Sequence, residues 1–147
     1  MPWIAPSLER SDPPYVADER RRLDSWLDFH RATLLSKCAD LTGDQLVQRP
    51  VATSTLSLLG LVRHMAANER IWFRIRFAGE DVEGLYESPG YPDGAEFGLI
   101  DAARAEADFR IYLDELQEAR RVTRGGRSTR PSGTRASPWI YGGYTPT

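Results

Sequence analysis

The stretch Ser57–Phe73 reads SLLGLVRHMAANERIWF and carries the strongest helical pattern in the chain. Its apolar residues recur at helical spacing, which predicts one long amphipathic helix from about residue 57 to residue 78, ended by Gly79. A histidine, His64, lies in the middle of this helix. It shares one helical face with Leu61, Asn68, Ile71 and Ile75. We therefore expect its imidazole to be half-buried between helices.

Two more long helices are predicted around this one. The first begins at about residue 17, and its apolar stripe consists of Leu23, Trp26, Leu27, His30, Leu34, Cys38 and Leu41. The other runs from about residue 101 to residue 122, with an apolar face of Phe109, Tyr112, Leu113 and Leu116. No segment alternates in the way that predicts a strand. The pattern indicates an all-α protein, an up-and-down bundle with three long helices whose fourth is missing or degenerate.

Shorter signals complete the expected organisation. Thr42-Gly43-Asp44-Gln45 fits a capping box, which predicts a short helix that Arg49-Pro50 ends. We divide the chain into an extended, proline-spaced N-terminal arm (1–16), a helical bundle domain (17–122) and an Arg/Gly/Ser-rich tail (123–147). The tail has too few apolar residues to offset the entropy of ordering, so we expect disorder there.

Composition restricts the class of protein. The 147 residues suffice for one domain, and the net charge of −2 favours no polyanionic partner. Charged residues are unevenly distributed along the chain, because residues 120–147 contain six arginines and no Asp or Glu. No stretch approaches the roughly 20 apolar residues of a membrane span. The N-terminus lacks a signal peptide pattern, and one cysteine excludes an intrachain disulfide. We expect a cytoplasmic protein with no membrane partner.

The arginine-rich tail allows three interpretations. Its composition suits an out-of-frame translation or otherwise degenerate end, an inert disordered tail, or a segment that binds phosphate groups. Between residues 120 and 135 the tail has no aromatic residues, and it matches no known motif for binding nucleic acid. We therefore do not expect nucleic acid as a partner.

The two histidines raise the question of a metal site. If the first two long helices are antiparallel and joined near residue 48, His30 lies level with Ala67, and the two imidazoles would be offset by about 4–5 Å along the axis. A zinc site needs about three protein ligands, so a carboxylate such as Glu69 would have to join His30 and His64. The alternative is that both histidines are core residues satisfied by hydrogen bonds.

Cys38 also has two interpretations. A reactive thiol needs a nearby cation or a helix N-terminus to lower its pKa. Cys38 instead lies late in its predicted helix, where the dipole opposes a thiolate, and more than a turn from the histidines. We interpret it as a small buried hydrophobic residue.

Three segments, Leu23–Leu35 (LDSWLDFHRATLL), Leu41–Leu46 (LTGDQL) and Ser57–Phe73, together resemble the DinB-like superfamily. More narrowly, they are similar to its actinobacterial mini-circle branch, related to mycothiol-dependent maleylpyruvate isomerases, over residues 19–120. The resemblance implies a four-helix bundle, commonly dimeric, that holds a divalent metal (zinc or nickel) with three histidines. It also implies mycothiol as the thiol substrate. His64 matches the first of the three ligands.

The sequence departs from this pattern at the other two ligands. The family places them about one turn apart on the fourth helix, but no histidine follows His64, and Trp139-Ile140-Tyr141 stands where that helix would begin. We therefore expect a truncated or degenerate member of a metal- and thiol-dependent transferase or isomerase family, with weak or no activity. Whether it is an enzyme stays open. The alternative is a non-catalytic helical module for interaction or homodimerisation.

Overall fold

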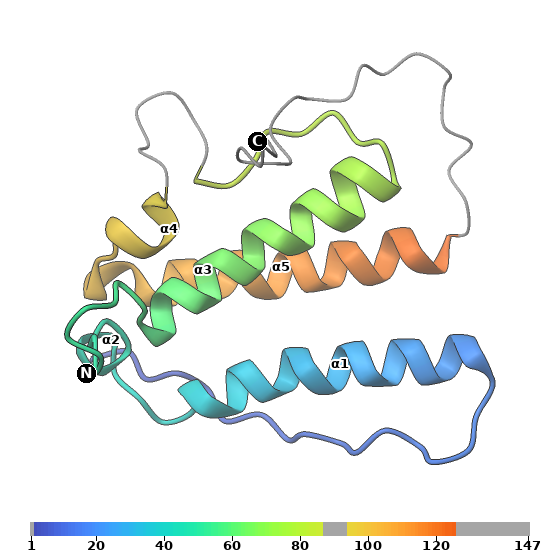
Figure 1. Cartoon of the computed structure of the whole chain (residues 1–147), viewed down its shortest axis with the longest axis horizontal. Coiled ribbons are helices and arrows are strands. Elements are labelled where there is room, and N and C mark those ends of the chain that lie inside the picture. Colours follow the sequence, from blue (N-terminus) through green and yellow to red (C-terminus); the bar gives the residue numbers. More distant parts are fainter. Residues whose placement is uncertain (1, 87–93, 126–147) are drawn as a thin grey trace, which may run out of the picture.

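The computed structural model describes residues 2–86 and 94–125 (Figure 1). Its elements are all helical: α1 (Glu19–Cys38), α2 (Gly43–Leu46), α3 (Leu58–Glu69), the π-helix η1 (Arg70–Phe77), α4 (Ala95–Gly98), the 3-10 helix η2 (Ala102–Arg104) and α5 (Ala105–Arg124). Within these residues there is no strand, only an isolated bridge between Ile4 and Thr42. The all-α prediction is confirmed.

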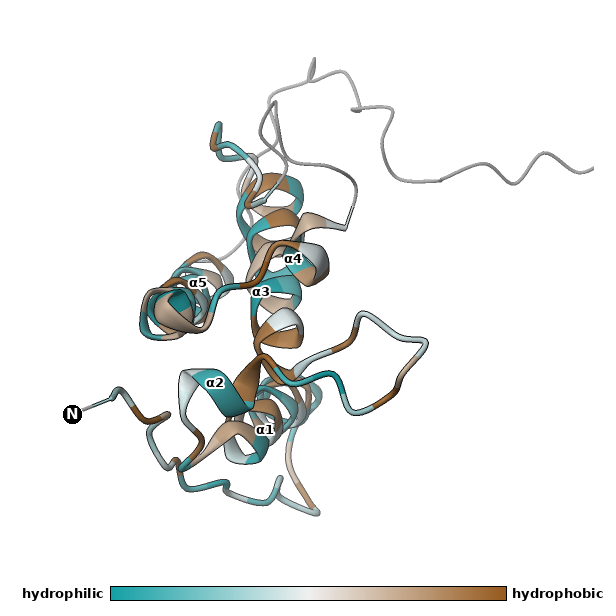
Figure 2. Cartoon of the chain, turned by 90° about the vertical axis from the view of Figure 1, so that its left-hand side faces the viewer, coloured by the Kyte–Doolittle hydropathy of each residue, from teal (hydrophilic) through white to brown (hydrophobic). Residues whose placement is uncertain are grey.

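The long helices surround one core. α3 and α5 lie side by side, and α1 lies below both of them, nearly along the direction of α5 in this view (Figure 1). In Figure 2 α1 and α5 are seen almost end-on, with α2 between them and α4 beside α3. Fully buried side chains from α1, α2, α3 and α5 meet in the middle: Leu35, Cys38, Leu46, Leu59, Val62, Phe109, Tyr112 and Leu116. Burial of these side chains is the main favourable contribution to folding.

The helix α1 begins where Asp18 accepts a hydrogen bond from the Arg21 amide. The N-terminal part of its predicted apolar stripe does not face the core, but Cys38 at the other end is buried and Leu34 and Leu41 pack against the core, as predicted. Leu23 is 62% exposed and Trp26 48% exposed, whereas the buried residues of the helix are Arg31, Leu35 and Cys38. The prediction is therefore corrected for the N-terminal part of the stripe, where Arg31 rather than His30 faces α3 and pairs with Glu69.

The connection from α1 to α3 follows the prediction at α2. The Thr42 hydroxyl accepts a hydrogen bond from the Gln45 amide, and the Gln45 side chain accepts one from the Thr42 amide, which confirms the capping box. The N-terminal segment joins this corner through backbone hydrogen bonds of Ala5 with Leu41 and Asp40. Trp3 packs its ring edge-on against Phe109, at 5.0 Å between ring centroids.

The second long helix begins as predicted, with Ser57 accepting from the Gly60 amide. It continues through α3 and η1 to Phe77, and Gly79 follows with a φ of +70°. The change to π-helix at Arg70 was not predicted. π-Helical turns are rare and often occur at functional sites.

The third long helix consists of η2 and α5. Asp101 caps η2, and Phe109, Tyr112 and Leu116 are buried as predicted. α5 extends through Arg124, two residues beyond the predicted end of the bundle. The rest of the expected tail, including Trp139–Tyr141, lies outside the described residues.

Candidate functional site

His64 lies where α3 meets α4. Its side chain is 42% exposed, and its Nδ1 atom is 3.4 Å from Oε1 of Glu96. The imidazole also packs against the Phe97 ring, with the centroids 5.0 Å apart. Asn68, one turn further along, donates a hydrogen bond to the His64 carbonyl. The imidazole is half-buried, as expected. Its neighbours, however, are Glu96 and Phe97 of the short helix α4 rather than residues of another long helix.

Sequence reasoning missed α4, and therefore Glu96. The segment GAEFG has four helical residues and two glycines, so it has no helical periodicity to detect. It becomes ordered through tertiary contacts with α3, in which Gly60 lets the Phe97 ring approach the helix backbone. No signal in the sequence would have placed Glu96 beside His64.

A buried arginine holds α4 in this position. Arg63, next to His64, donates hydrogen bonds to the backbone carbonyls of Glu96 at 3.1 Å and Ala95 at 3.3 Å. It also pairs with buried Asp108 of α5 at 3.2 Å. The Tyr86 ring stacks on the same guanidinium at 4.0 Å and donates its hydroxyl to Asp108. Arg63 thus connects α3 with α4 and α5, and it positions Glu96, whose carboxylate faces His64.

Tyr86 is held in an unusual backbone conformation, with a φ of +60°. Burial raises the pKa of its phenol above the ordinary range, and the Asp108 carboxylate adds to this shift. The phenol therefore stays protonated and able to donate to Asp108.

His30 does not join His64. It is exposed on α1, where its ring stacks on Trp26 at 5.7 Å and meets Phe29 edge-on. The predicted antiparallel register of α1 and α3 was close, because Arg31 does pair with Glu69. However, Arg31 rather than His30 faces α3, so the two imidazoles do not face each other, and the alternative interpretation of His30 as a core residue is wrong as well.

Glu69 is also not available to a metal at His64. Both of its carboxylate oxygens accept hydrogen bonds from Arg31, at 2.8 and 2.5 Å, and both side chains are at least 95% buried. Burial alone would lower the pKa of the Arg31 guanidinium, but its contacts with Glu69 and Asp28 outweigh burial and raise it. The pair is therefore a structural contact between α1 and α3.

Cys38 is fully buried, and burial raises the pKa of its thiol to about 11. A protonated thiol is a poor nucleophile and a poor metal ligand. Its environment agrees with the interpretation as a small buried hydrophobic residue.

The sequence predicts a metal site at His64, which requires other metal-binding side chains nearby. Across residues 2–86 and 94–125, no cluster of three or more His, Cys, Asp or Glu side chains could hold a metal ion. His64 and Glu96 provide two candidate donors, and a catalytic zinc site needs about three protein ligands. The described residues thus do not complete the three-ligand site that the resemblance implies.

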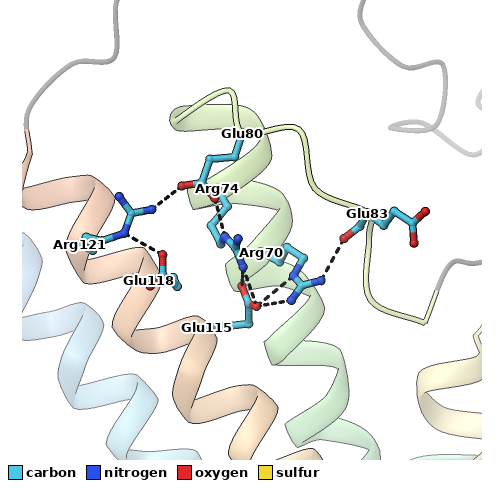
Figure 3. Close-up of polar contacts among 7 residues, drawn as sticks. All are labelled: Arg70, Arg74, Glu80, Glu83, Glu115, Glu118 and Arg121. Carbon is cyan, nitrogen blue, oxygen red and sulfur yellow. Dashed lines mark hydrogen bonds and ion pairs between the residues drawn. The ribbon is translucent and has the colours of Figure 1, made fainter.

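A second polar cluster lies at the other end of α3, around η1 (Figure 3). Arg70 and Arg74 both pair with buried Glu115 of α5, at 2.5 and 3.1 Å. Arg74 also pairs with Glu80, which in turn pairs with Arg121. The hydrogen bond from Arg74 lowers the pKa of Glu80, and Arg121 adds to this effect. Each arginine has a carboxylate partner, so this cluster joins helices rather than attracting an anion.

No helix in the described part of the chain is long and apolar enough to cross a membrane. A comparison with protein families finds a match between residues 22–141 and the family model described as Mycothiol-S-transferase. No curated protein and no solved structure matches the chain. The family is DinB-like, which confirms the resemblance at that level. The match extends past residue 120, where the motif resemblance ended; the mini-circle branch and the frameshifted end stay predictions.

Proposed function

The chain belongs to the mycothiol-S-transferase family, and from this premise we propose that it is a mycothiol-dependent transferase scaffold with weak or no activity. The proposed substrate is the small thiol itself, and the proposed location is the cytoplasm. The observation that carries the proposal is the donor set at His64, which has one imidazole and one carboxylate where the resemblance implies three histidines.

We further propose His64 as the metal-binding residue of this chain, for zinc or nickel. Glu96 supports this role, because its carboxylate oxygen lies 3.4 Å from Nδ1 and would supply a second donor beside the imidazole. A bound divalent metal would lower the pKa of a thiol and so favour the nucleophilic thiolate. With so few donors, we expect weak metal binding and little thiolate formation.

The histidines offer a matched pair for the metal test. Zinc and nickel chloride are titrated by calorimetry into the protein, into His64→Ala and into His30→Ala. We expect weak binding, with a dissociation constant on the order of 10 µM or more, that is lost in His64→Ala and kept in His30→Ala. Binding that persists in His64→Ala would contradict the assignment.

The activity is tested separately. Mycothiol and a chromogenic electrophile are incubated with the protein, with and without zinc or nickel. We expect turnover within about tenfold of the uncatalysed reaction, since each missing ligand weakens stabilisation of the thiolate. Turnover on the order of 1 per second would show that the chain is a working transferase and would overturn this part of the proposal.

The second candidate function is a non-catalytic interaction module. It is favoured by large apolar side chains that the described residues leave exposed, among them Leu23 and Trp26 on α1 and Trp72 on η1. Such side chains, when contiguous, mark surfaces for association. A sedimentation measurement distinguishes the cases, since a monomer at all concentrations would argue against a dimerisation role.

A further inference from the structure

A cavity of about 410 Å³ lies against the C-terminal half of α5, at the end of this helix away from α4 (Figure 1). Four residues line it: Gln117, Arg120, Arg121 and Arg124. Their spacings of three, one and three residues place them on one face of the helix. The volume is in the range of sites that hold a small molecule, and three of the four side chains are cations. Such a lining favours a negatively charged occupant.

The cavity is separate from the site at His64. Arg63, the neighbour of His64, pairs with Asp108 in the first turn of α5. Arg124 follows Asp108 by 16 residues, which corresponds to about 24 Å along the helix. A ligand in the cavity would therefore not touch His64 or Glu96.

Arg120 is oriented by α1 and has donors to spare. Its Nε and Nη2 atoms both donate to Oδ1 of Asp28, at 3.1 and 2.9 Å, which fixes the plane of the guanidinium. Within residues 2–86 and 94–125 its Nη1 atom donates no hydrogen bond, and the side chain is 37% exposed. A guanidinium has five N–H groups, of which these contacts use two. Arg120 is thus able to bind an anion without releasing Asp28.

Arg124 lies one turn beyond Arg120 on the same face of α5. Its side chain is exposed and forms no ion pair with any other described residue. Arg121 differs, because Glu118 and Glu80 hold it in the cluster of Figure 3. Arg121 therefore forms a wall of the cavity, and Arg120 and Arg124 are the side chains with donors available to a ligand.

The ion pairs around the cavity leave one positive charge over. Arg120 and Arg31 share Asp28, and Arg31 also pairs with Glu69, so this group has two charges of each sign. The cluster of Figure 3 is balanced as well, with three arginines paired to three glutamates. Arg124 adds a cation for which the described residues supply no carboxylate. An anion in the cavity would balance this charge.

The C-terminal end of a helix normally disfavours an anion, because its last carbonyl groups carry partial negative charge. In α5 donors occupy several of these carbonyls. Arg20 of α1 donates to the Thr123 carbonyl at 3.0 Å, and the Gly125 amide donates to the Arg121 carbonyl at 3.2 Å. These bonds satisfy the exposed end of the helix, and Arg20 brings a further cation to it. The repulsion of an anion is therefore reduced.

We propose that this cavity binds the oxyanion group of a small molecule, a carboxylate or a phosphate, with Arg120 and Arg124 donating to its oxygen atoms and the Gln117 amide adding a donor from the preceding turn. The planar fork of a guanidinium matches two oxygen atoms of either group. The donors are largely exposed, so binding is weak, with a dissociation constant on the order of 1 mM. The site uses neither a metal nor a thiol at His64, so its test is independent of the proposed transferase function.

The first experiment titrates inorganic phosphate, and separately succinate, into the full chain. Nuclear magnetic resonance follows the backbone amides and the arginine Nε–H groups, at anion concentrations up to about 50 mM in low salt, because added salt screens the interaction. We expect saturable shifts that are largest at residues 117–125. Saturation by phosphate alone would identify a phosphate group as the ligand, and saturation by succinate alone would identify a carboxylate.

The second experiment compares two arginines of the same helix. Arg124→Gln removes a cation from the cavity, whereas Arg110→Gln removes one that is 74% exposed elsewhere on α5 and pairs with Glu106. We expect Arg124→Gln to raise the dissociation constant by about fivefold and Arg110→Gln to leave it within about 1.5-fold. Circular dichroism checks that both variants keep the helix content of the original protein.

A third variant tests the cavity without removing an arginine. Gln117→Glu places a negative charge in the lining, and its exposed position makes a loss of folding unexpected. Because like charges repel, we expect this variant to weaken anion binding by about as much as Arg124→Gln.

Three outcomes overturn the proposal. In the first, neither anion gives saturable shifts in the full chain, whether the cavity is too open to hold it or residues 126–147 fill it. In the second, Arg124→Gln and Arg110→Gln weaken binding equally, so that only net charge matters. In the third, Gln117→Glu binds the anion as well as the original protein does.

Discussion

Arg31 and Glu69 form a buried ion pair between α1 and α3. They are 38 residues apart in the chain and form the contact by which α1 is oriented on α3. Arg31 also stacks on the Phe73 ring at 5.3 Å and pairs with Asp28, which Arg120 of α5 contacts as well. A buried charge is tolerated only when it is paired in this way.

This pair makes a prediction for stability. Glu69→Gln leaves the buried Arg31 cation with only the half-exposed Asp28 as counter-charge, so we expect the free energy of unfolding to fall by about 3 kcal/mol. Urea denaturation at neutral pH measures the loss. Asp24→Asn is the control, because it removes an exposed ion pair with Arg20 on the same helix and should cost less than about 0.5 kcal/mol. Equal losses in the two variants would contradict the prediction.

At the level of elements, short helices without periodicity make the close contacts. α2 packs against η2 so tightly that a Cβ atom on Gly43 would collide with the backbone carbonyl of Ala102. α4 packs against α3, where Gly60 makes room for Phe97. These small elements join the long helices at one end of the molecule and hold Glu96 beside His64.

Gly43→Ala tests the contact between α2 and η2. The added methyl meets backbone, which moves less readily than a side chain, so we expect a loss of about 2 kcal/mol in the free energy of unfolding. Gly98→Ala is the control, because no atom lies within 4 Å of the position of its Cβ. That variant should change stability by no more than about 0.5 kcal/mol. Thermal denaturation of both variants measures the two changes in stability. If Gly43→Ala were as stable as the original protein, the close contact between α2 and η2 would not contribute to stability.

At the scale of the whole molecule, a network of ion pairs joins η1 to α5 at the end of the long helices away from α4. The cluster in Figure 3 links η1, the loop after it and α5 through Glu80 and Glu115. Because the folded protein lowers the pKa of Glu80, its carboxylate stabilises the fold above the ordinary pKa of about 4.5, and this contribution is lost as the pH falls through the lowered pKa.

Glu80→Gln should therefore be less stable than the original protein at pH 7, and at least half of that difference should disappear near pH 3. Chemical denaturation at the two pH values measures it. Glu83→Gln is the control: Arg70 contacts its backbone carbonyl, and its side chain points away from the cluster (Figure 3). A difference for Glu80→Gln that is the same at both pH values would rule out its role in the pH dependence.

Periodicity was enough to predict the long helices. The capping box at Thr42, the N-cap at Ser57 and the buried face of Phe109, Tyr112 and Leu116 all depend on neighbours within a few residues, so local sequence contains the information. The half-burial of His64 was also predictable, because it follows from the position of one residue on one amphipathic helix.

The site and the orientation of α1 were not predictable in the same way. An apolar stripe indicates a face that favours burial, but it does not say which other surface is available to bury it. On α1 Arg31 pairs with Glu69 of α3, and the N-terminal residues of the stripe, Leu23 and Trp26, are exposed. Glu96 reaches His64 through α4, which contacts α3 through Arg63 and Phe97. The orientation of α1 and the position of Glu96 beside His64 both depend on contacts between residues more than 30 positions apart. Helical periodicity contains no information about such contacts.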